Sequence, residues 1–126
     1  MITNENCIFC QIVARHTPAY IVYEDTHFIA FLDIHPLAPG HVQIIPKDHY
    51  RFVWDVPNAG AYFTVAQKIA KALQLVFRKD LIRSQIFGEQ IFHAHIWVWP
   101  DLPIEGEEKE FQLISEKIRD ALEFVK

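Results

Sequence analysis

The links between the apolar segments of this sequence are short, and this limits the fold more than any other feature. The segments "AYIVYED" and "THFIAFLDI" are rich in β-branched and aromatic residues and meet at an acidic turn, Glu24–Asp25. A turn rich in proline and glycine, "HPLAPG", separates them from a third such segment, "HVQIIP". Parallel strands need a connection of about a dozen residues or more, so these links predict antiparallel pairing.

The spacing of apolar residues changes to that of a helix between about Asn58 and Phe77. The residues that recur at intervals of three and four are Phe63, Ala66, Ile69, Ala70, Leu73 and Phe77. This pattern predicts an amphipathic helix that places these side chains in the core, with Asp55 or Asn58 as its N-cap.

Three more elements complete the predicted fold. The segments "LIRSQIF" and "IFHAHIWVW" predict a second hairpin around Gly88, and "EEKEFQLISEKIRDALEFV" predicts a final helix with acidic residues in its first turn. We therefore expect an α+β fold with a five-stranded antiparallel sheet, a long central helix and a C-terminal helix. We expect one domain over residues 1–126, because 51% hydrophobic residues in a chain of 126 supply a single core.

The overall charge and the N-terminal segment restrict the partners and the compartment. A net charge of −4 argues against a nucleic-acid backbone or an anionic membrane as the main partner. No segment approaches the roughly 18 apolar residues of a membrane span, and "MITNENC" has no apolar signal region. We expect a cytoplasmic protein.

The two cysteines, Cys7 and Cys10, form a Cys-x-x-Cys pair that suits two thiolates on one tetrahedral zinc ion. A redox dithiol and two ordinary buried cysteines are the alternatives. Zinc needs two more ligands from the seven histidines, among which His49 ends the third predicted strand and His93 lies on the fifth. A Cys₂His₂ set leaves no open coordination position, so such a metal would be structural.

The segment "IFHAHIWVWP" carries two histidines in an apolar strand. Side chains alternate between the two faces of a strand, so His93, His95 and Trp97 share one face. Neighbours on one face are roughly 7 Å apart, so the two imidazoles suit two adjacent roles better than one shared metal. The alternative is a pair of half-buried histidines that bind backbone carbonyls.

Asp33 ends the second predicted strand before a proline turn. An aspartate there most often stabilises the turn through an Asx hydrogen bond. Its functional alternative is to accept hydrogen bonds from the two hydroxyls of a ribose.

Three blocks of the sequence together resemble the histidine triad (HIT) family. They are "CIFCQIV", "VYEDTHFIAFLDIHPLAPGHVQIIPKDH" and "GEQIFHAHIWVWP", in this order, and they run from Cys7 to about Pro100. Members of this family hydrolyse or transfer nucleotidyl groups of nucleoside phosphoramidates, dinucleoside polyphosphates and related phosphoanhydrides. The resemblance therefore implies a HIT-like fold and a small-molecule nucleotide as partner.

The resemblance also implies roles for individual residues. The middle histidine of the family's His-x-His-x-His motif attacks the α-phosphorus, and His95 matches it. The zinc ligands of the bacterial branch of the family match Cys7, Cys10, His49 and His93. The nucleoside-holding segment matches Phe31, Asp33 and Ile34, with Asp33 on the ribose.

A homodimer is the assembly that the resemblance implies, formed through the long helix and a strand edge. The helix carries more apolar residues than one core face requires. The second stripe includes Tyr62, Val65, Ala72 and Val76, and we assign it to the partner.

The sequence departs from the family pattern at three places that belong to the phosphate site. Trp97 replaces the third histidine, and an indole has no proton to transfer to a leaving group. The segment "RSQIFGEQIFH" has one glycine and is shorter than the family's Gly-rich loop. Glu89 stands where a glutamine is common, and Gln90 is a second candidate for that contact. We expect Glu89, Gln90 and Trp97 to line the nucleotide site.

Two hypotheses on function follow. The first is a zinc-containing nucleotide hydrolase or nucleotidyl transferase that forms a covalent nucleotidyl-His95 intermediate. The second is a catalytically degenerate HIT domain that binds a nucleotide or a protein partner without turnover. His95, Asp33 and the complete metal set favour the first, whereas Trp97, Glu89 and the short loop favour the second. A pocket for a nucleoside between Asp33 and His95 would separate them.

Overall fold

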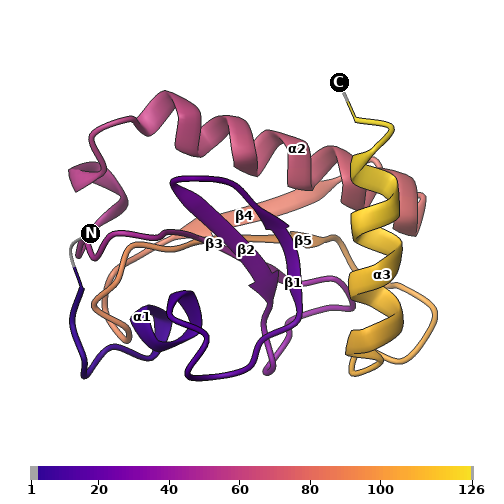
Figure 1. The fold of residues 1–126 in the computed structure, drawn as a ribbon. Coiled ribbons are helices and arrows are strands. Elements are labelled where there is room, and N and C mark those ends of the chain that lie inside the picture. The colour runs from indigo at the N-terminus through magenta and orange to yellow at the C-terminus, as the bar shows by residue number, and fades with distance from the viewer. Residues whose placement is uncertain (1–2, 126) are drawn as a thin grey trace.

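The computed structural model describes residues 3–125, which form a five-stranded antiparallel sheet with helices on both faces (Figure 1). The elements are α1 (Ile8–Val13), β1 (Ile21–Glu24), β2 (Phe28–Leu32), β3 (Val42–Pro46), the short 3-10 helix η1 (Val53–Asp55), α2 (Ala59–Phe77), β4 (Ile82–Ile86), β5 (Ile96–Pro100) and α3 (Phe111–Leu122). This confirms the predicted α+β class and the order of the strands and the two long helices. The sequence did not predict α1, because six residues are too few for helical spacing to show.

The strand order places β5 in the interior of the sheet. The order is β1-β2-β3-β5-β4, and every neighbouring pair is antiparallel. Trp97 on β5 therefore lies opposite Gln43 on one side and Gln85 on the other. The two core clusters lie on opposite faces of the sheet, one under α2 and one against α1 (Figure 1).

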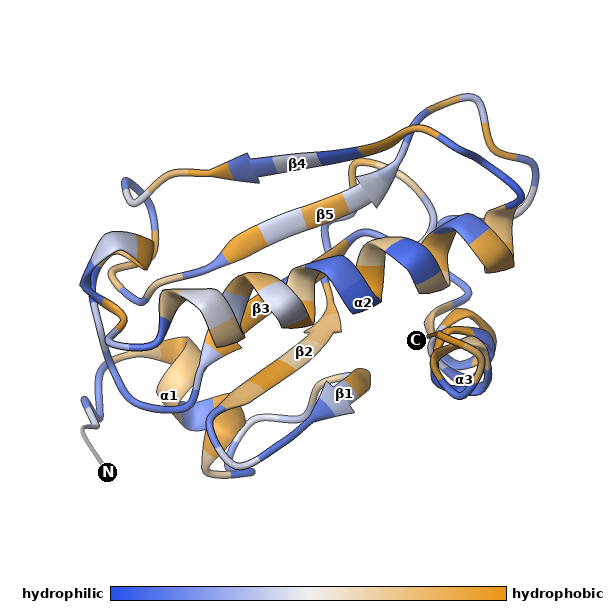
Figure 2. Cartoon of the chain, turned by 90° about the horizontal axis from the view of Figure 1, so that it is seen from above, coloured by the Kyte–Doolittle hydropathy of each residue, from blue (hydrophilic) through white to orange (hydrophobic). Residues whose placement is uncertain are grey.

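The helix α2 packs on the sheet through most of the predicted stripe and through part of the second one. Of the predicted residues, Ile69 and Leu73 are buried, and Ala66, Ala70 and Phe77 pack against the core. The buried residues of α2 are Tyr62, Val65, Ile69, Ala72 and Leu73. Phe63, which we assigned to the core, is 41% exposed. Tyr62, which we assigned to a partner, is fully buried, stacks on Phe28 and donates a hydrogen bond to the Ile44 carbonyl at 2.6 Å. Hydrophobic residues recur along the whole helix (Figure 2), so their spacing predicts the helix but does not mark where its buried face ends.

The two long helices begin differently. Asn58 is confirmed as the N-cap of α2, because its Oδ1 accepts a hydrogen bond from the Ala61 amide at 3.1 Å. α3 begins at Phe111, and its first turn has no acidic residue, so the predicted acidic first turn is wrong. The glutamates that we placed there precede the helix. No helix within residues 3–125 has the length and apolar character needed to cross a bilayer.

The second hairpin is confirmed as a strand pair, but its connection is longer than predicted. The pairing runs from Ile82 opposite Pro100 to Ile86 opposite Ile96. Residues 87–95, including both histidines, therefore precede β5 rather than lie within it. Here the Ala94 amide donates to the Tyr50 carbonyl at 2.6 Å, which holds this segment against the loop after β3 instead of against β4.

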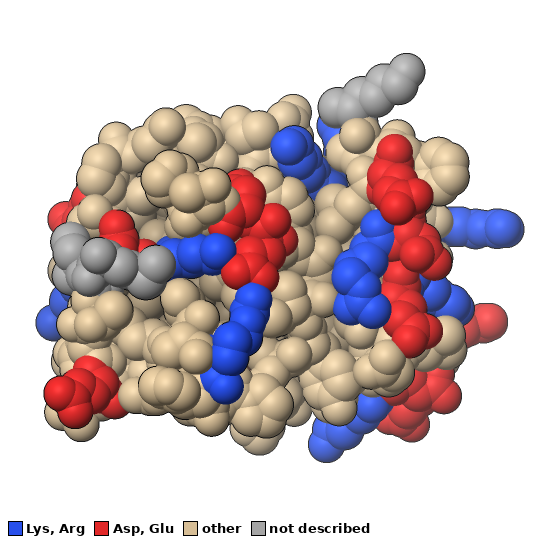
Figure 3. Space-filling view, in the orientation of Figure 1, with Lys and Arg blue, Asp and Glu red and all other residues tan. Residues whose placement is uncertain are grey.

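Charged side chains of both signs mix on the surface. On the face seen in Figure 3, basic side chains lie among acidic ones. One cluster centres on Glu24, which pairs with Arg15 and, at 2.7 Å, with Lys47. These partners together lower the pKa of Glu24.

Candidate functional site

Four predicted metal ligands meet in one cluster. Cys7, Cys10, His49 and His93 each offer one ligand atom, and these atoms all lie within 4.8 Å of one another. Nδ1 of His93 is 3.3 Å from the sulfur of Cys7 and 3.5 Å from that of Cys10. Nδ1 of His49 is 3.3 Å from the sulfur of Cys10. The cluster thus joins α1, the loop after β3 and the segment before β5.

The donor set and its spacing fit a tetrahedral zinc ion. With Zn–S bonds of about 2.3 Å and Zn–N bonds of about 2.0–2.1 Å, the ligand atoms of a tetrahedron are about 3.3–3.8 Å apart. His93 also donates from Nε2 to the Pro46 carbonyl at 2.8 Å, which leaves the lone pair of Nδ1 for the metal. Such a hydrogen bond on the far nitrogen is typical of histidines that bind zinc.

The environment of the cysteines favours metal over redox chemistry. Both thiols are free and buried, and Cys7 caps α1 by accepting a hydrogen bond from the Cys10 amide at 3.4 Å. Burial raises the pKa of the Cys10 thiol to about 11. A reactive dithiol has a lowered pKa, so the Cys10 thiol needs a cation beside it to become a thiolate.

His95 has the tautomer of a nucleophile. Its Nδ1 donates to the carbonyl of His93 at 2.7 Å, and no hydrogen bond within residues 3–125 uses its Nε2. Desolvation lowers the pKa of His95, so the ring is neutral near neutral pH. A neutral imidazole with a fixed Nδ1 proton presents the lone pair of Nε2.

Aromatic rings surround His95, which is 2% exposed. The ring centroids of Phe9, Phe87 and Trp97 lie 5.6, 5.3 and 6.4 Å from that of His95. Phe87 also contacts Trp97 edge-on at 4.7 Å. The nucleophile candidate is thus covered by α1 on one side and by the start of the connection 87–95 on the other.

Asp33 and Trp97, both predicted site residues, are joined through Gln43. The Asp33 Oδ1 accepts from the His35 amide at 2.8 Å, which confirms the Asx hydrogen bond of the turn. Its Oδ2 accepts from Nε2 of Gln43 at 3.0 Å. The Oε1 of Gln43 in turn accepts from the indole of Trp97 at 3.2 Å.

The other predicted nucleotide contacts lie around this chain of hydrogen bonds. Phe31 is buried and meets Phe9 edge-on at 5.5 Å, whereas Ile34 is 59% exposed. Glu89 and Gln90 are exposed in the connection 87–95, and neither forms a hydrogen bond or ion pair with another described residue.

Sequence reasoning did not identify Gln43, Phe9 or Phe87 as site residues. The available clue to Gln43 was a single amide among apolar residues in "HVQIIP", because a polar side chain in a buried strand needs a partner. Phe9 and Phe87 carried no such clue, since aromatic residues occur throughout this chain.

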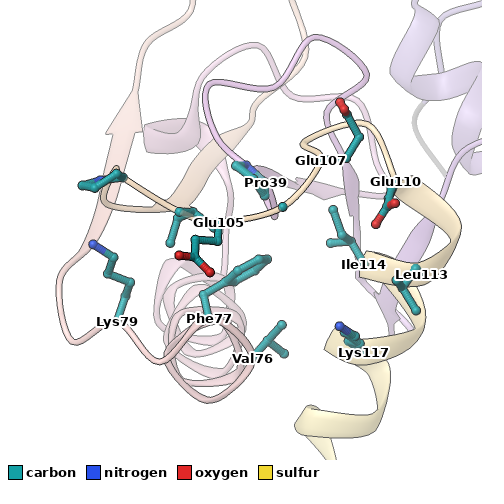
Figure 4. Close-up of a pocket in the computed structure, with 13 residues that line it drawn as sticks. Pro39, Val76, Phe77, Lys79, Glu105, Glu107, Glu110, Leu113, Ile114 and Lys117 are labelled. Atoms are coloured by element: carbon teal, nitrogen blue, oxygen red, sulfur yellow. The ribbon is translucent and has the colours of Figure 1, made fainter.

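Three surface cavities have walls made largely of other residues. Of three surface cavities of about 400 to 450 Å³, none is lined by Asp33, His95 or Trp97. One lies between the end of α2 and the start of α3, with Phe77 and Ile114 among its walls (Figure 4). Another, of about 410 Å³, is lined by residues 51–54 and 86–89 and shares Phe87 with the surroundings of His95.

Comparison with known sequences identifies relatives over most of the chain. A profile of the HIT domain matches residues 14–103. "Protein hit" of Bacillus subtilis is 38% identical over 103 residues, which cover 76% of this chain and 71% of that protein. An adenosine 5′-monophosphoramidase of Saccharomyces cerevisiae is 34% identical over 99 residues, which cover 75% of this chain and 61% of that protein.

Solved structures show the same fold. A HIT-like protein from Bartonella henselae is similar with a TM-score of 0.84 and 33% identity, over 94% of this chain and 98% of that one. A zinc-bound histidine triad family protein from Mycobacterium smegmatis is similar with a TM-score of 0.76 and 30% identity, over 94% of each chain. The Cys₂His₂ cluster described above is consistent with zinc. By its domain match, its relatives and its fold, this chain belongs to the histidine triad (HIT) family.

Proposed function

We propose that this chain is a nucleotide hydrolase or nucleotidyl transferase that acts through a covalent nucleotidyl-His95 intermediate. The observation that carries the proposal is the hydrogen bond from Nδ1 of His95 to the His93 carbonyl at 2.7 Å. This hydrogen bond fixes the tautomer in which Nε2 is the nucleophile. The imidazole ring of His95 therefore does not have to move before it attacks.

The proposed substrate is a nucleoside phosphoramidate, phosphoanhydride or phosphate ester. The similarity to an adenosine 5′-monophosphoramidase supports a nucleotide substrate. Asp33 would accept the ribose hydroxyls with the lone pairs that His35 and Gln43 leave free, because a carboxylate offers about four acceptor sites. Phe31 and Ile34 would hold the nucleoside, and Glu89, Gln90 and Trp97 would lie at the phosphate.

The proposed reaction has two displacements at phosphorus. The lone pair of Nε2 attacks the α-phosphorus, and the leaving group departs with the electrons of its bond. The ring becomes cationic, and its Nδ1 keeps the proton that it donates in the hydrogen bond to the His93 carbonyl. Water, or another acceptor, then attacks phosphorus and the P–N bond breaks, which returns the lone pair to Nε2. The proton of the water passes to the solvent.

The cluster would support this reaction without taking part in it. When bound by Cys7, Cys10, His49 and His93, zinc would supply only a structural cross-link. The protein's own contacts then place the nucleophile. His93 is held by the Pro46 carbonyl, the Ala94 amide is held by the Tyr50 carbonyl, and the His93 carbonyl holds His95.

A second candidate is a HIT domain that binds a nucleotide or a protein without turnover. The contacts of Phe87 with His95 and Trp97 favour it, because they cover the nucleophile. Catalysis requires that Phe87 move aside, whereas simple binding at another surface does not.

Detection of the intermediate separates the two candidates. Wild-type protein is mixed with a fluorogenic ester of AMP, and the reaction is quenched in base, which preserves the P–N bond. The mass of the intact protein is then measured by mass spectrometry. We expect an added nucleotidyl mass on the wild type and none on His95→Ala. His16→Ala, at an exposed histidine outside the site, is the control and should behave as wild type. Binding of AMP without adduct or turnover of any ester, anhydride or phosphoramidate would establish the binding domain instead.

A further inference from the structure

The only hydrogen-bond donor of the Trp97 side chain is already used within the protein. An indole has one N–H and no acceptor. In this chain that N–H donates to Oε1 of Gln43 at 3.2 Å, across the β3–β5 pair in which the two residues are directly opposite. The position that holds the third histidine in the family pattern therefore offers a substrate neither a proton nor a free N–H.

The orientation of the Gln43 amide follows from its two neighbours. The carboxylate of Asp33 accepts only, so it must face the NH₂ group of Gln43. The indole of Trp97 donates only, so it must face the carbonyl oxygen. A glutamine is an uncharged side chain that satisfies both at once, and the reverse orientation of the amide would satisfy neither.

Burial makes this arrangement persistent. Asp33 and Gln43 are each 8% exposed, and β3 is buried along its whole length. Release of the indole would leave Oε1 of Gln43 without its partner in a site from which water is largely excluded. Unpaired buried polar atoms are costly, so the N–H of Trp97 stays on Gln43 while a substrate is bound.

The rings that contact Trp97 supply no substitute for the missing donor. Phe87 is apolar, and Trp99 meets Trp97 edge-on at 6.4 Å. His41 contacts Trp97 at 4.8 Å but is 1% exposed, accepts from the Leu37 amide at Nδ1, and has its Nε2 3.7 Å from Asp33. Its remaining nitrogen thus faces a carboxylate of the protein and not a leaving group.

We propose that Gln43 is a positioning residue that holds the Trp97 N–H, so that position 97 neither protonates nor hydrogen-bonds a leaving group. The site then selects substrates whose leaving group departs as a stable anion. This rests on the proposed attack by His95. A carboxylate or a phosphate accepts the electron pair of the breaking bond and needs no proton. The amine of a phosphoramidate must be protonated as it leaves, and a positioned acid contributes about 10²–10⁴-fold to such a step. The selected class is therefore the mixed anhydrides of a nucleoside monophosphate with a carboxylic or phosphoric acid.

The test compares two substrates that share AMP and differ in the leaving group. One is a mixed anhydride of AMP with benzoate, and the other is an AMP N-alkyl phosphoramidate. The quantity measured is the ratio of their kcat/KM values. In Trp97→Phe the ring is kept and the N–H is lost, and we expect both rates to change together, which leaves the ratio within about threefold of wild type. A selective loss of phosphoramidate turnover in Trp97→Phe would overturn the proposal, because it would show that the indole N–H serves the leaving group.

A second comparison tests Gln43 directly. Trp97→His introduces an imidazole that could serve as a donor, but Gln43 binds its N–H. The ratio of kcat/KM for the anhydride to kcat/KM for the phosphoramidate should therefore fall only modestly. The double variant Trp97→His with Gln43→Leu frees the imidazole, and we expect the anhydride-to-phosphoramidate ratio to fall by about 10²-fold or more. The matched control combines Trp97→His with Gln85→Leu. Gln85 faces Trp97 from the other neighbouring strand, is exposed, and makes no side-chain hydrogen bond with a described residue. Equal ratios in the two double variants would refute a role for Gln43.

The outcomes separate this inference from the proposed function. If wild type turns over no ester, anhydride or phosphoramidate of AMP, or if turnover survives in His95→Ala, the proposed function is wrong and the inference fails with it. If wild type turns over the fluorogenic AMP ester but neither the benzoate anhydride nor the phosphoramidate, the proposed function stands and the inference is wrong. If turnover depends on His95 but Trp97→His with Gln43→Leu leaves the substrate ratio unchanged, the proposed function stands and the inference is wrong. Melting curves accompany each variant, and the Trp97→Phe comparison still decides if the double variants do not fold.

Discussion

Among single residues, Cys10 is the one that best tests the metal cluster, because its sulfur lies close to both histidines of the set. We predict that purified wild-type protein contains about one zinc per chain and that Cys10→Ser loses it. A ligand that binds only the folded state stabilises it by about 2.7 kcal/mol at 100 times its Kd. The Cys10→Ser variant should therefore melt several degrees below wild type, as measured by calorimetry with metal analysis in parallel.

Chelation provides the control for this prediction. A strong chelator should lower the melting temperature of wild type to that of Cys10→Ser and should leave the variant unchanged. A wild-type protein that is free of metal, keeps its melting temperature in chelator and holds a Cys7–Cys10 disulfide would contradict the assignment.

The residues of the site differ in how far the sequence could predict them. Cys7, Cys10, His49 and His93 were named from residue type, spacing and family resemblance, and the structure brings all of them together. Gln43 was not named, because its two partners are 10 and 54 residues away along the chain. Only the register of β2, β3 and β5 brings them to it, and register is not readable from apolar alternation alone.

Among the elements, the connection 87–95 depends on one close contact. A Cβ on Gly88 would lie 2.6 Å from two ring atoms of Phe52, so Gly88→Ala must displace the ring or the loop. Because Phe87 and His95 border this loop, we predict that Gly88→Ala lowers kcat/KM by up to about 10²-fold, the cost of a shift of about 1 Å in a reacting group. Steady-state kinetics on the fluorogenic AMP ester would measure it.

Two further variants show whether this effect comes from the contact itself. Gly88→Ala combined with Phe52→Ala removes the clash and should recover most of the activity. Gly60→Ala, in the first turn of α2, meets nothing closer than 3.9 Å and should keep full activity with unchanged or slightly higher stability. Loss of activity that persists in the Gly88→Ala, Phe52→Ala double variant would rule out the steric explanation.

The elements predicted from the sequence were those with long, regular patterns. The first three strands, α2 and its cap Asn58 followed from spacing and turn residues, and the structure confirms them. The start of β5 was placed about five residues too early, because the apolar run "IFHAHIWVW" alternates before the ladder with β4 begins. In residues 91–95, hydrogen bonds from Ala94 to Tyr50 and from His93 to Pro46 replace those of the strand ladder. Hydrogen bonds between residues so far apart leave no pattern in the local sequence.

For the whole molecule, we propose a homodimer and predict its interface on the outer side of α2. The burial of Tyr62, Val65 and Ala72 in the core removes most of the stripe that we first assigned to a partner. Phe63 and Leu75, which are 41% and 55% exposed, are the large apolar residues that α2 leaves to solvent. Light scattering at micromolar concentration should report about twice the 14.8 kDa chain mass.

Substitution on this outer side tests the interface. Phe63→Glu should give the mass of a single chain with an unchanged fold by circular dichroism, because a charged group there would be desolvated in a dimer. Lys109→Glu, at an exposed position outside α2, is the control for a change of charge alone. A single-chain mass for wild type at all concentrations would exclude the dimer.

The strand order also has a consequence for synthesis on the ribosome, where the chain emerges from its N-terminus. β4 leaves the ribosome before β5, and β5 is the strand with which it pairs. β4 therefore remains unpaired until residues 96–100 have emerged. Cys10 remains without this histidine of the cluster for longer still, because His93 lies 83 residues further along the chain. The β1-β2-β3 meander is thus the first part of the sheet that a nascent chain can form. The segment of residues 93–100 follows last. It places β5 between β3 and β4 and brings His93 to the two cysteines.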